Sequence, residues 1–265
     1  MSSIKTGDEA ALSAPLRSLF SRESLVVGAA LAAAAVLAWL WLLSSPMGGA
    51  SDMAGTGMAP QPLSAAYLVP AFTMWAIMMV AMMVPSAAPM ILLHARIDKA
   101  DTRRARTLHT LLFALAYLLV WTGFSASAAL AQALLVRSGI LSDMALTIGD
   151  RTLAAVLLIG AAAYELTAAK RLCLDKCQSP LLFIMRNWKP GATGAFRLGL
   201  RHGLYCLGCC WALMLLLFVG GVMNLAWVAL LGIVVLGEKF APPRWRAERS
   251  VAAVLLIAAL AMILA

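Results

Sequence analysis

Seven long runs of apolar residues constrain what this chain can fold into more than any other feature of its sequence. A bilayer core of roughly 30 Å is crossed by about 20 apolar residues in a helix, and most of the runs approach that length. The runs are 25–43, 67–93, 108–136, 152–169, 203–220, 224–241 and 251–265. They predict an all-α fold, a polytopic bundle of about seven transmembrane helices.

The composition agrees with this prediction and excludes the soluble classes of protein. Of the 265 residues, 63% are hydrophobic and 12% are charged, whereas a typical soluble domain is about 45–50% apolar and about 25% charged. So much apolar surface cannot be hidden inside one water-facing domain. A soluble enzyme and a disordered chain are therefore excluded, and the lipid bilayer is the expected partner.

The formal net charge of +9 reflects topology and does not indicate nucleic acid. Cytoplasmic segments of membrane proteins collect Lys and Arg, and all but two of the 21 basic residues fall in segments on one side of the predicted membrane. The two exceptions are Arg137 and Arg151. We therefore expect the N-terminus inside, the C-terminus outside, and residues 170–201 as the longest cytoplasmic segment.

The spans also predict how the chain is organised. Residues 1–24 form a cytoplasmic tail, 25–43 a first span, 44–66 an outer loop rich in Met, Gly and Pro, and 67–265 a helical membrane domain. The first span could instead be a cleaved signal peptide, which would leave six spans. Its apolar stretch exceeds the about 7–15 residues usual for such a peptide, so we expect an uncleaved anchor.

The cysteines form two clusters toward the predicted inner side. They are Cys173 and Cys177 after the fourth span, and Cys206, Cys209 and Cys210 in the fifth. In a helix, His202 and the second cluster share one face, because their spacings are i, i+4, i+7 and i+8. A buried cysteine can be a small packing residue, but three beside one histidine favour a metal site. A disulfide is disfavoured on a reducing side.

Methionines form the second pattern. Met74, Met78 and Met82 share one face of the second span, Met79 and Met83 form an adjacent stripe, and two prolines that follow open the helix. Such a stripe can be core packing or a row of thioether ligands. The outer loop adds three methionines where no core exists. They indicate either a flexible segment that binds a soft metal ion through thioethers or an unconstrained linker. They are Met47, Met53 and Met58.

Thiolate and thioether donors together select soft ions, so Cu(I) is the first candidate and zinc the second. Two further residues are auxiliary candidates. Glu165 is the one acid well inside a span; such an acid is a functional candidate by default, although at this depth it could reach the interface. His94 lies at the inner end of the second span. Glu238 and Lys239 are expected to form a membrane-edge ion pair or to contact the 170–201 segment.

Four motifs make the chain similar to a known family. They are Trp75-x-x-Met78-x-x-x-Met82-Met83-x-Pro85-x-x-x-Pro89, Tyr164-x-Leu166-Thr167-x-x-Lys170 with Cys173-x-x-x-Cys177-x-Ser179-Pro180, Gly203-x-x-Cys206-x-Gly208-Cys209-Cys210-Trp211, and Met223-Asn224 followed by Glu238-Lys239. Together they resemble the bacterial predicted metal-binding integral membrane proteins, some of which serve as copper chaperones for a neighbouring polyphenol oxidase. The resemblance implies the same fold and a copper-related role. The chain departs from the family pattern at Glu165 and Ala168, where Gln and Pro are expected.

These observations predict a protein of the bacterial cytoplasmic membrane that binds Cu(I) and is not an enzyme. It would deliver copper to a partner cuproenzyme or metallochaperone, or transport the ion. Two alternatives stay open: a membrane thiol–disulfide oxidoreductase that uses its cysteine pairs, and a non-catalytic subunit of a membrane complex.

Overall fold

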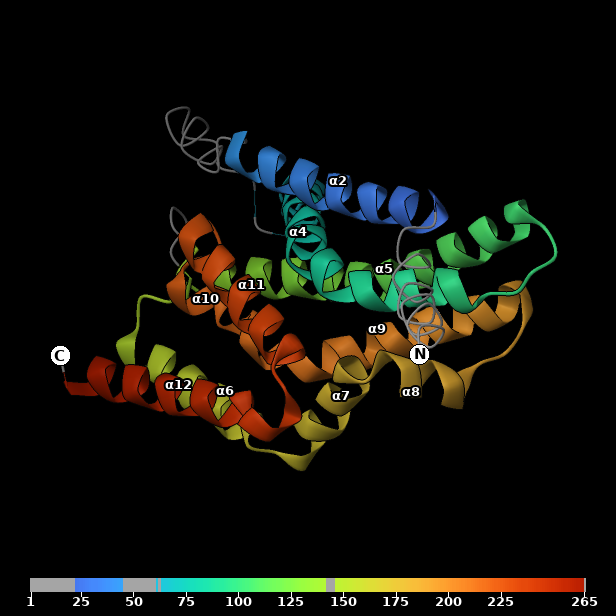
Figure 1. The fold of residues 1–265 in the computed structure, drawn as a ribbon. Helices are drawn as coiled ribbons and strands as arrows, with labels where there is room; N and C mark the ends of the chain where they lie inside the picture. The colour runs from blue at the N-terminus through green and yellow to red at the C-terminus, as the bar shows by residue number, and fades with distance from the viewer. Residues whose placement is uncertain (1–21, 45–60, 62, 142–145, 265) are drawn as a thin grey trace.

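The computed structural model describes residues 22–44, 61, 63–141 and 146–264, and within these ranges the chain is helical (Figure 1). A single bridge between Leu141 and Ile148 is the one β-type pairing of this part of the chain. The elements are α2 (Arg22–Ser44), α4 (Ala65–Ile97), α5 (Arg103–Arg137), α6 (Arg151–Glu165), α7 (Ala168–Gln178), α8 (Pro180–Asn187), α9 (Gly191–Leu215), α10 (Leu217–Gly220), α11 (Leu225–Phe240), the 3₁₀ turn η1 (Pro243–Trp245) and α12 (Ala247–Leu264). The predicted all-α fold is confirmed.

The helices are arranged around a centre made by α4, α5 and α9. Helix α2 packs on α4 at one flank, and α6 pairs with α12 at the opposite flank (Figure 1). The short helix α7 lies against α9, α8 packs against α7 and α4, and α11 contacts α4, α7 and α9. Helix α9 is thus in contact with α5, α6, α7, α10 and α11.

In the described ranges, five helical segments are long and apolar enough to cross a membrane: Ser24–Ser44, Ala65–Ile97, Arg103–Arg137, Gly191–Gly220 and Ala247–Leu264. The pair α6 and α7 passes the same test together, which gives up to six crossings. Helix α11 has 16 residues, about 24 Å at 1.5 Å per residue, which is shorter than a bilayer core of roughly 30 Å. Helices occupy all seven predicted places, but not all of them have the length of a span.

The fourth predicted span, 152–169, is wrong as a single helix. The chain bends by 64° between α6 and α7, because Thr167 ends one helix and begins the next. Its hydroxyl donates to the carbonyl of Tyr164 at 2.7 Å and accepts from the backbone N–H of Lys170 at 3.2 Å. A threonine side chain that caps a helix in this way competes with continued helix. The bend turns α7 back against α9.

Helices α5 and α9 approach each other closely where α9 carries glycine. A Cβ at Gly199 would lie 2.2 Å from the carbonyl oxygen of Phe113, and one at Gly203 would lie 2.8 Å from a methyl carbon of Val120. Small residues four apart allow such close backbone packing in apolar helix bundles. This contact fixes the depth at which α5 and α9 side chains meet.

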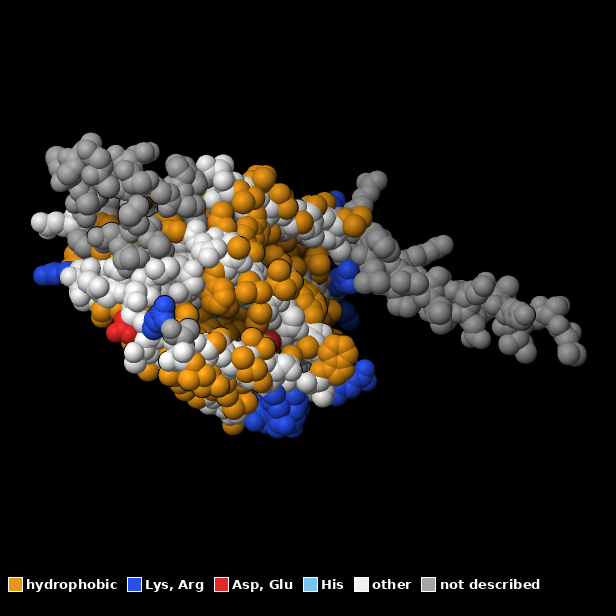
Figure 2. Space-filling view, turned by 90° about the vertical axis from the view of Figure 1, so that its left-hand side faces the viewer, with side chains coloured by type: hydrophobic (Ala, Val, Ile, Leu, Met, Phe, Trp, Pro, Cys, Tyr) orange, Lys and Arg blue, Asp and Glu red, His pale blue; other side chains and the backbone are white. Residues whose placement is uncertain are grey.

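The outer surface is largely apolar. Figure 2 shows one face covered by hydrophobic side chains, with Lys and Arg gathered toward its edges. Many large apolar residues are exposed on the helices, among them Leu115 on α5 at 58% and Ile257 on α12 at 68%. A soluble monomer rarely exposes apolar patches of this extent, so the surface is of the kind that lipid covers.

Candidate metal centre

Cys206, in the middle of α9, is the residue on which most polar contacts converge. Its side chain is completely buried. The Nζ of Lys239, at the end of α11, donates to its Sγ at 2.9 Å, and the Tyr117 hydroxyl of α5 lies 3.1 Å from the same sulfur. Lys239 also donates to the Ser86 hydroxyl of α4 at 2.8 Å. Side chains from three neighbouring helices thus surround this thiol.

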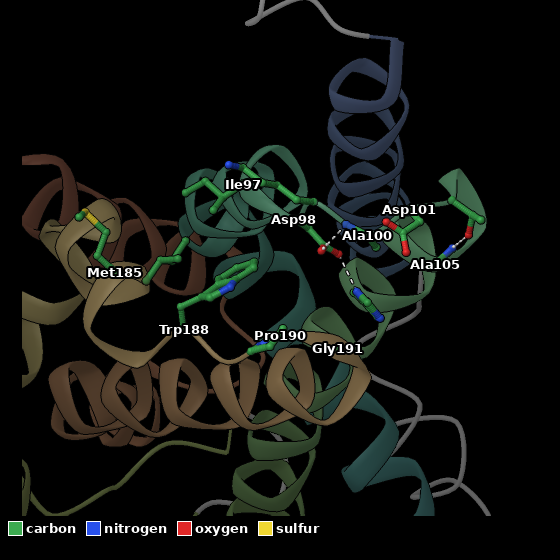
Figure 3. Close-up of a pocket in the computed structure, with 13 residues that line it drawn as sticks. Ile97, Asp98, Ala100, Asp101, Ala105, Met185, Trp188, Pro190 and Gly191 are labelled. Atoms are coloured by element: carbon green, nitrogen blue, oxygen red, sulfur yellow. Dashed lines mark hydrogen bonds and ion pairs between the residues drawn. The ribbon is translucent and has the colours of Figure 1, made fainter.

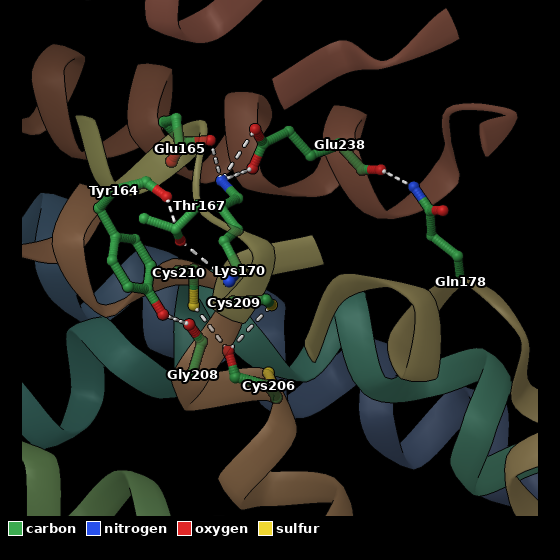
Figure 4. Close-up of polar contacts among 10 residues, drawn as sticks. All are labelled: Tyr164, Glu165, Thr167, Lys170, Gln178, Cys206, Gly208, Cys209, Cys210 and Glu238. Atoms are coloured by element: carbon green, nitrogen blue, oxygen red, sulfur yellow. Dashed lines mark hydrogen bonds and ion pairs between the residues drawn. The ribbon is translucent and has the colours of Figure 1, made fainter. Parts of the chain in front are cut away.

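Cys209 and Cys210 turn back toward Cys206. Both are buried, at 1% exposed, and their thiols donate to the Cys206 carbonyl at 3.1 and 3.0 Å (Figure 4). Residues three and four apart share a helix face, so the expected grouping on α9 is present. The face lies inside the bundle and not toward lipid.

Helix α7 brings the second cysteine cluster to the first. Helices α7 and α9 pack against each other, and Cys177 lines one cavity together with His202 of α9. The Cys173 sulfur lies against α9 at Gly208, where an added Cβ would be only 2.8 Å from it. Both α7 cysteines are half-buried, and all five cysteines are free thiols. Two clusters that are about 30 residues apart in sequence therefore form one thiol-rich region, which we call the thiol cluster.

His202 belongs to the rim of the thiol cluster. It is 3% exposed, and its ring stacks on Phe113 and Tyr117 with centroid distances of 6.1 and 5.5 Å. His202 lines a cavity of about 280 Å³ together with Met90, Cys177 and Lys239. The cavity also reaches the end of α11. This cavity gives the cluster a mouth that carries a sulfur, an imidazole and an ammonium.

His94 is placed by a different set of aromatic rings. It is buried, and its ring lies 5.0 Å from Phe113 and 5.5 Å from Trp188 between centroids. Phe113 is therefore shared between His94 and His202. The Nδ1 atoms of both histidines have no hydrogen-bond partner among the described groups.

The predicted methionine stripe faces the interior of the bundle. Met74, Met78, Met82 and Met83 are all buried, at 7% exposed or less. A Cβ at Gly232 of α11 would lie 3.5 Å from Cγ of Met82, which is ordinary packing. The Tyr117 hydroxyl donates to the carbonyl of Met83 at 3.0 Å, so this end of the stripe adjoins the thiol cluster. Met47, Met53 and Met58 lie outside the described residues.

Glu165 does not reach toward an interface but ends in a buried ion group. Its carboxylate binds the Nζ of Lys170, and Glu238 binds the same ammonium at 2.7 and 3.0 Å (Figure 4). All three side chains are 3% exposed or less. Glu238 thus contacts the 170–201 segment, as one of the two expectations had it, while Lys239 enters the thiol cluster.

The donors are those of a soft ion, but they do not form a ready three-ligand site. In the described part of the chain, no three His, Cys, Asp or Glu side chains are grouped so as to hold a metal ion. A linear Cu(I) site needs only two sulfurs, and thiolate is a preferred ligand of Cu(I). Cys206 and Cys209, which are buried on one face of α9, offer such a pair.

Sequence reasoning missed three polar members of the site: Ser86, Tyr117 and Lys239. A lysine that ends a long apolar run was interpreted as an interfacial residue, since lysine often reaches a membrane surface. The signal that could have found Lys239 is its position beside Glu238 in one of the four motifs, two others of which contain the cysteines. Neither hydroxyl residue stands out in a sequence of this composition.

A larger cavity, of about 710 Å³, lies at the end of the bundle where α4 leads into α5 and α8 leads into α9 (Figure 3). Asp98, Trp188 and Met185 line it, and the Asp98 carboxylate lies 2.7 Å from Nδ1 of His109. None of the cysteines lines it. We therefore place the candidate metal centre at the smaller cavity.

A comparison with protein families gives the geometry a context. Residues 72–262 match the family model PpoB2, described as a copper chaperone. The chain belongs to this family. The match covers all five cysteines, Lys239 and the described methionine stripe, and membership of a copper chaperone family supports copper binding and a non-catalytic role. No curated protein and no solved structure matches the chain.

Proposed function

We propose that this protein is embedded in a bacterial cytoplasmic membrane, binds Cu(I) through buried thiolates and delivers it to a partner cuproenzyme. The observation that carries the proposal is the thiol cluster, in which α7 and α9 bring five free cysteines together inside an apolar bundle. Thiolates in a water-poor site prefer soft monovalent ions. Membership of the copper chaperone family supports copper as the ion and delivery as the role.

Within the thiol cluster we assign the ion to Cys206 and Cys209, two buried thiols on one face of α9. Cys210 and Cys177 are the further sulfurs: the Cys210 thiol donates to the same carbonyl of Cys206 as that of Cys209, and Cys177 lines the adjoining cavity with Lys239. Cys173 and His202 stand at the edge of the cluster. Zinc, which accepts the same ligands in a tetrahedral set, is the second candidate ion.

The cavity beside the cluster is the proposed route for the ion. Arg201 is the last charged residue of α9 and precedes Cys206 by five residues, about 7.5 Å along a helix axis. The cluster therefore lies just below one membrane surface, which the distribution of Lys and Arg makes the cytoplasmic one. On the other side, the methionine stripe leads from Met83 toward the opposite end of α4, where thioethers could pass Cu(I) along.

Ligand exchange between thiols explains how the protein could release a tightly bound ion. Cu(I) with two sulfurs has room for a third, so an incoming thiolate or thioether of a partner can bind before a resident ligand leaves. Four thiols within one region offer several such pairs. Transfer to a cuproenzyme or to a soluble metallochaperone would use the same step.

The direct test is metal analysis of the protein purified in detergent. After loading with Cu(I) under reducing conditions and removal of excess copper by a chelator, the wild type is expected to retain about one equivalent. The triple variant C206S/C209S/C210S and the single variant C206S are expected to lose most of it.

Ala212→Ser is a matched control, because it adds a hydroxyl at another buried position of α9 without removing a sulfur. It should retain copper. If the triple variant retains the ion as the wild type does, the thiol cluster is not the copper site. If the wild type holds no copper and instead forms a disulfide that turns over, between Cys206 and Cys209 or between Cys173 and Cys177, the protein is a thiol oxidoreductase.

A further inference from the structure

Among the described residues, two lysines are buried, and their surroundings differ in kind. The ammonium of Lys170 is bound by two carboxylates, those of Glu165 and Glu238. The ammonium of Lys239, 8% exposed, is bound by the sulfur of Cys206 and the hydroxyl of Ser86. Among the described residues no carboxylate pairs with it.

A buried charge without a counter-charge is costly. The negative charge that would balance Lys239 has one evident source, the sulfur 2.9 Å away. Lys170 cannot take part in the same way, because its own two carboxylates already surround it. Lys239 is therefore the buried group that interacts most directly with the charge of an ion in the thiol cluster.

The charge of a metal complex at these thiols depends on the ion. A Cu(I) ion with two thiolates carries one negative charge, which one ammonium neutralises. A divalent ion with the same two thiolates is neutral, so the ammonium beside it would be left as an uncompensated buried charge. A third thiolate could restore the balance, but no three such side chains are grouped as a site in the described part of the chain.

We propose that Lys239 sets the charge of the cargo: its ammonium makes the thiol cluster select a monovalent over a divalent soft ion. This inference rests on the proposed function and names the residue that gives it its specificity. Ser86 acts as a positioning residue, because its hydroxyl accepts from the ammonium at 2.8 Å and holds it toward Cys206.

The size of the effect follows from the distance. The Lys239 nitrogen is 2.9 Å from the Cys206 sulfur, and a metal–thiolate bond adds about 2.3 Å, so an ion on this sulfur lies within about 5 Å of the ammonium. With an effective dielectric constant of about 20, one additional unit of positive charge at that distance is disfavoured by on the order of 100-fold.

The experiment measures Cu(I) and Zn(II) affinities of the full chain in detergent, each by competition with a chelator of known affinity, and compares their ratio between variants. Lys239→Met and Lys239→Gln, which remove the charge, are expected to lower the preference for Cu(I) by about 100-fold. Lys239→Arg, which keeps the charge, should retain the preference. Lys189→Met removes an exposed lysine and should also leave it unchanged, because water screens such a charge.

An unchanged ratio in Lys239→Met or Lys239→Gln, with Cu(I) still bound, overturns the inference but leaves the proposed function intact. Failure of the wild type to bind Cu(I) at its cysteines would refute the proposed function itself. A second measurement needs only the wild type: Ag(I) at one equivalent should protect the thiols from alkylation, whereas Cd(II) should need a large excess. Equal protection by the two ions also overturns the inference, even if no neutral variant folds.

Discussion

The close approach of α5 and α9 predicts that one methyl group at Gly199 disturbs both the fold and the site. A Cβ there would lie 2.2 Å from the Phe113 carbonyl oxygen and 2.9 Å from its Cα, all of it backbone. Ordinary contact begins at 3.4 Å, so the two helices must separate by about 1 Å. The Tyr117–Cys206 contact of 3.1 Å, less than two helical turns further along α9, would be stretched.

Overpacking of this kind costs about 1–3 kcal/mol, which corresponds to a fall in Tm of roughly 3–10 °C for a chain of this size. In detergent, we expect the Tm of Gly199→Ala to be lower than that of the wild type by this amount. Unfolding can be measured with a dye that becomes fluorescent on reaction with thiols, because the buried cysteines are then exposed. Gly160→Ala is the matched control, because nothing lies within 4 Å of its Cβ position. It should be neutral or slightly stabilising, since alanine favours helix over glycine. If Gly199→Ala melts with the wild type, the reasoning from the α5–α9 contact is refuted.

Three further predictions concern the buried polar groups. Lys170→Met leaves Glu165 and Glu238 together without a cation. We expect it to lower the free energy of unfolding by about 3–5 kcal/mol, visible as a poor yield of protein from the membrane. The variant that also carries E165Q and E238Q should be obtained in normal yield. Tyr117→Phe removes the hydroxyl beside Cys206 and should cost about 1 kcal/mol in thermal unfolding while copper is retained; loss of copper would make the hydroxyl part of the site. Bound Cu(I) should block alkylation of the cysteines, and its removal by a chelator should restore it; cysteines equally reactive with and without copper would contradict their role as ligands.

The fold class could be predicted because hydropathy alone decides it. Each apolar run lies in helical structure, although the fourth and fifth runs are each divided between two helices, since a chain in lipid must satisfy its backbone hydrogen bonds internally. The bend at Thr167 could not be predicted from hydropathy, because a cap hydrogen bond of one hydroxyl decides it. That bend also decides that Cys173 and Cys177 return to α9 and do not stay in a cytoplasmic loop.

The candidate site was predictable as far as helix periodicity reaches. Cys206, Cys209 and Cys210 share a buried face because their spacing fixes it. The approach of Lys239 and Tyr117 to Cys206 depends on the packing of α5 and α11 against α9, about which spacing within one helix says nothing. The same holds for the ion group of Glu165, whose partner Lys170 lies on α7 and also binds Glu238 of α11.

The measurement that tests the central claim most directly is X-ray absorption at the copper edge of the Cu(I)-loaded protein. The account predicts that sulfur alone surrounds the ion, with two short bonds, and that C206S and C209S each change this spectrum while Ala212→Ser does not. A copper ion bound by nitrogen or oxygen, or a spectrum unaffected by either cysteine variant, would contradict it.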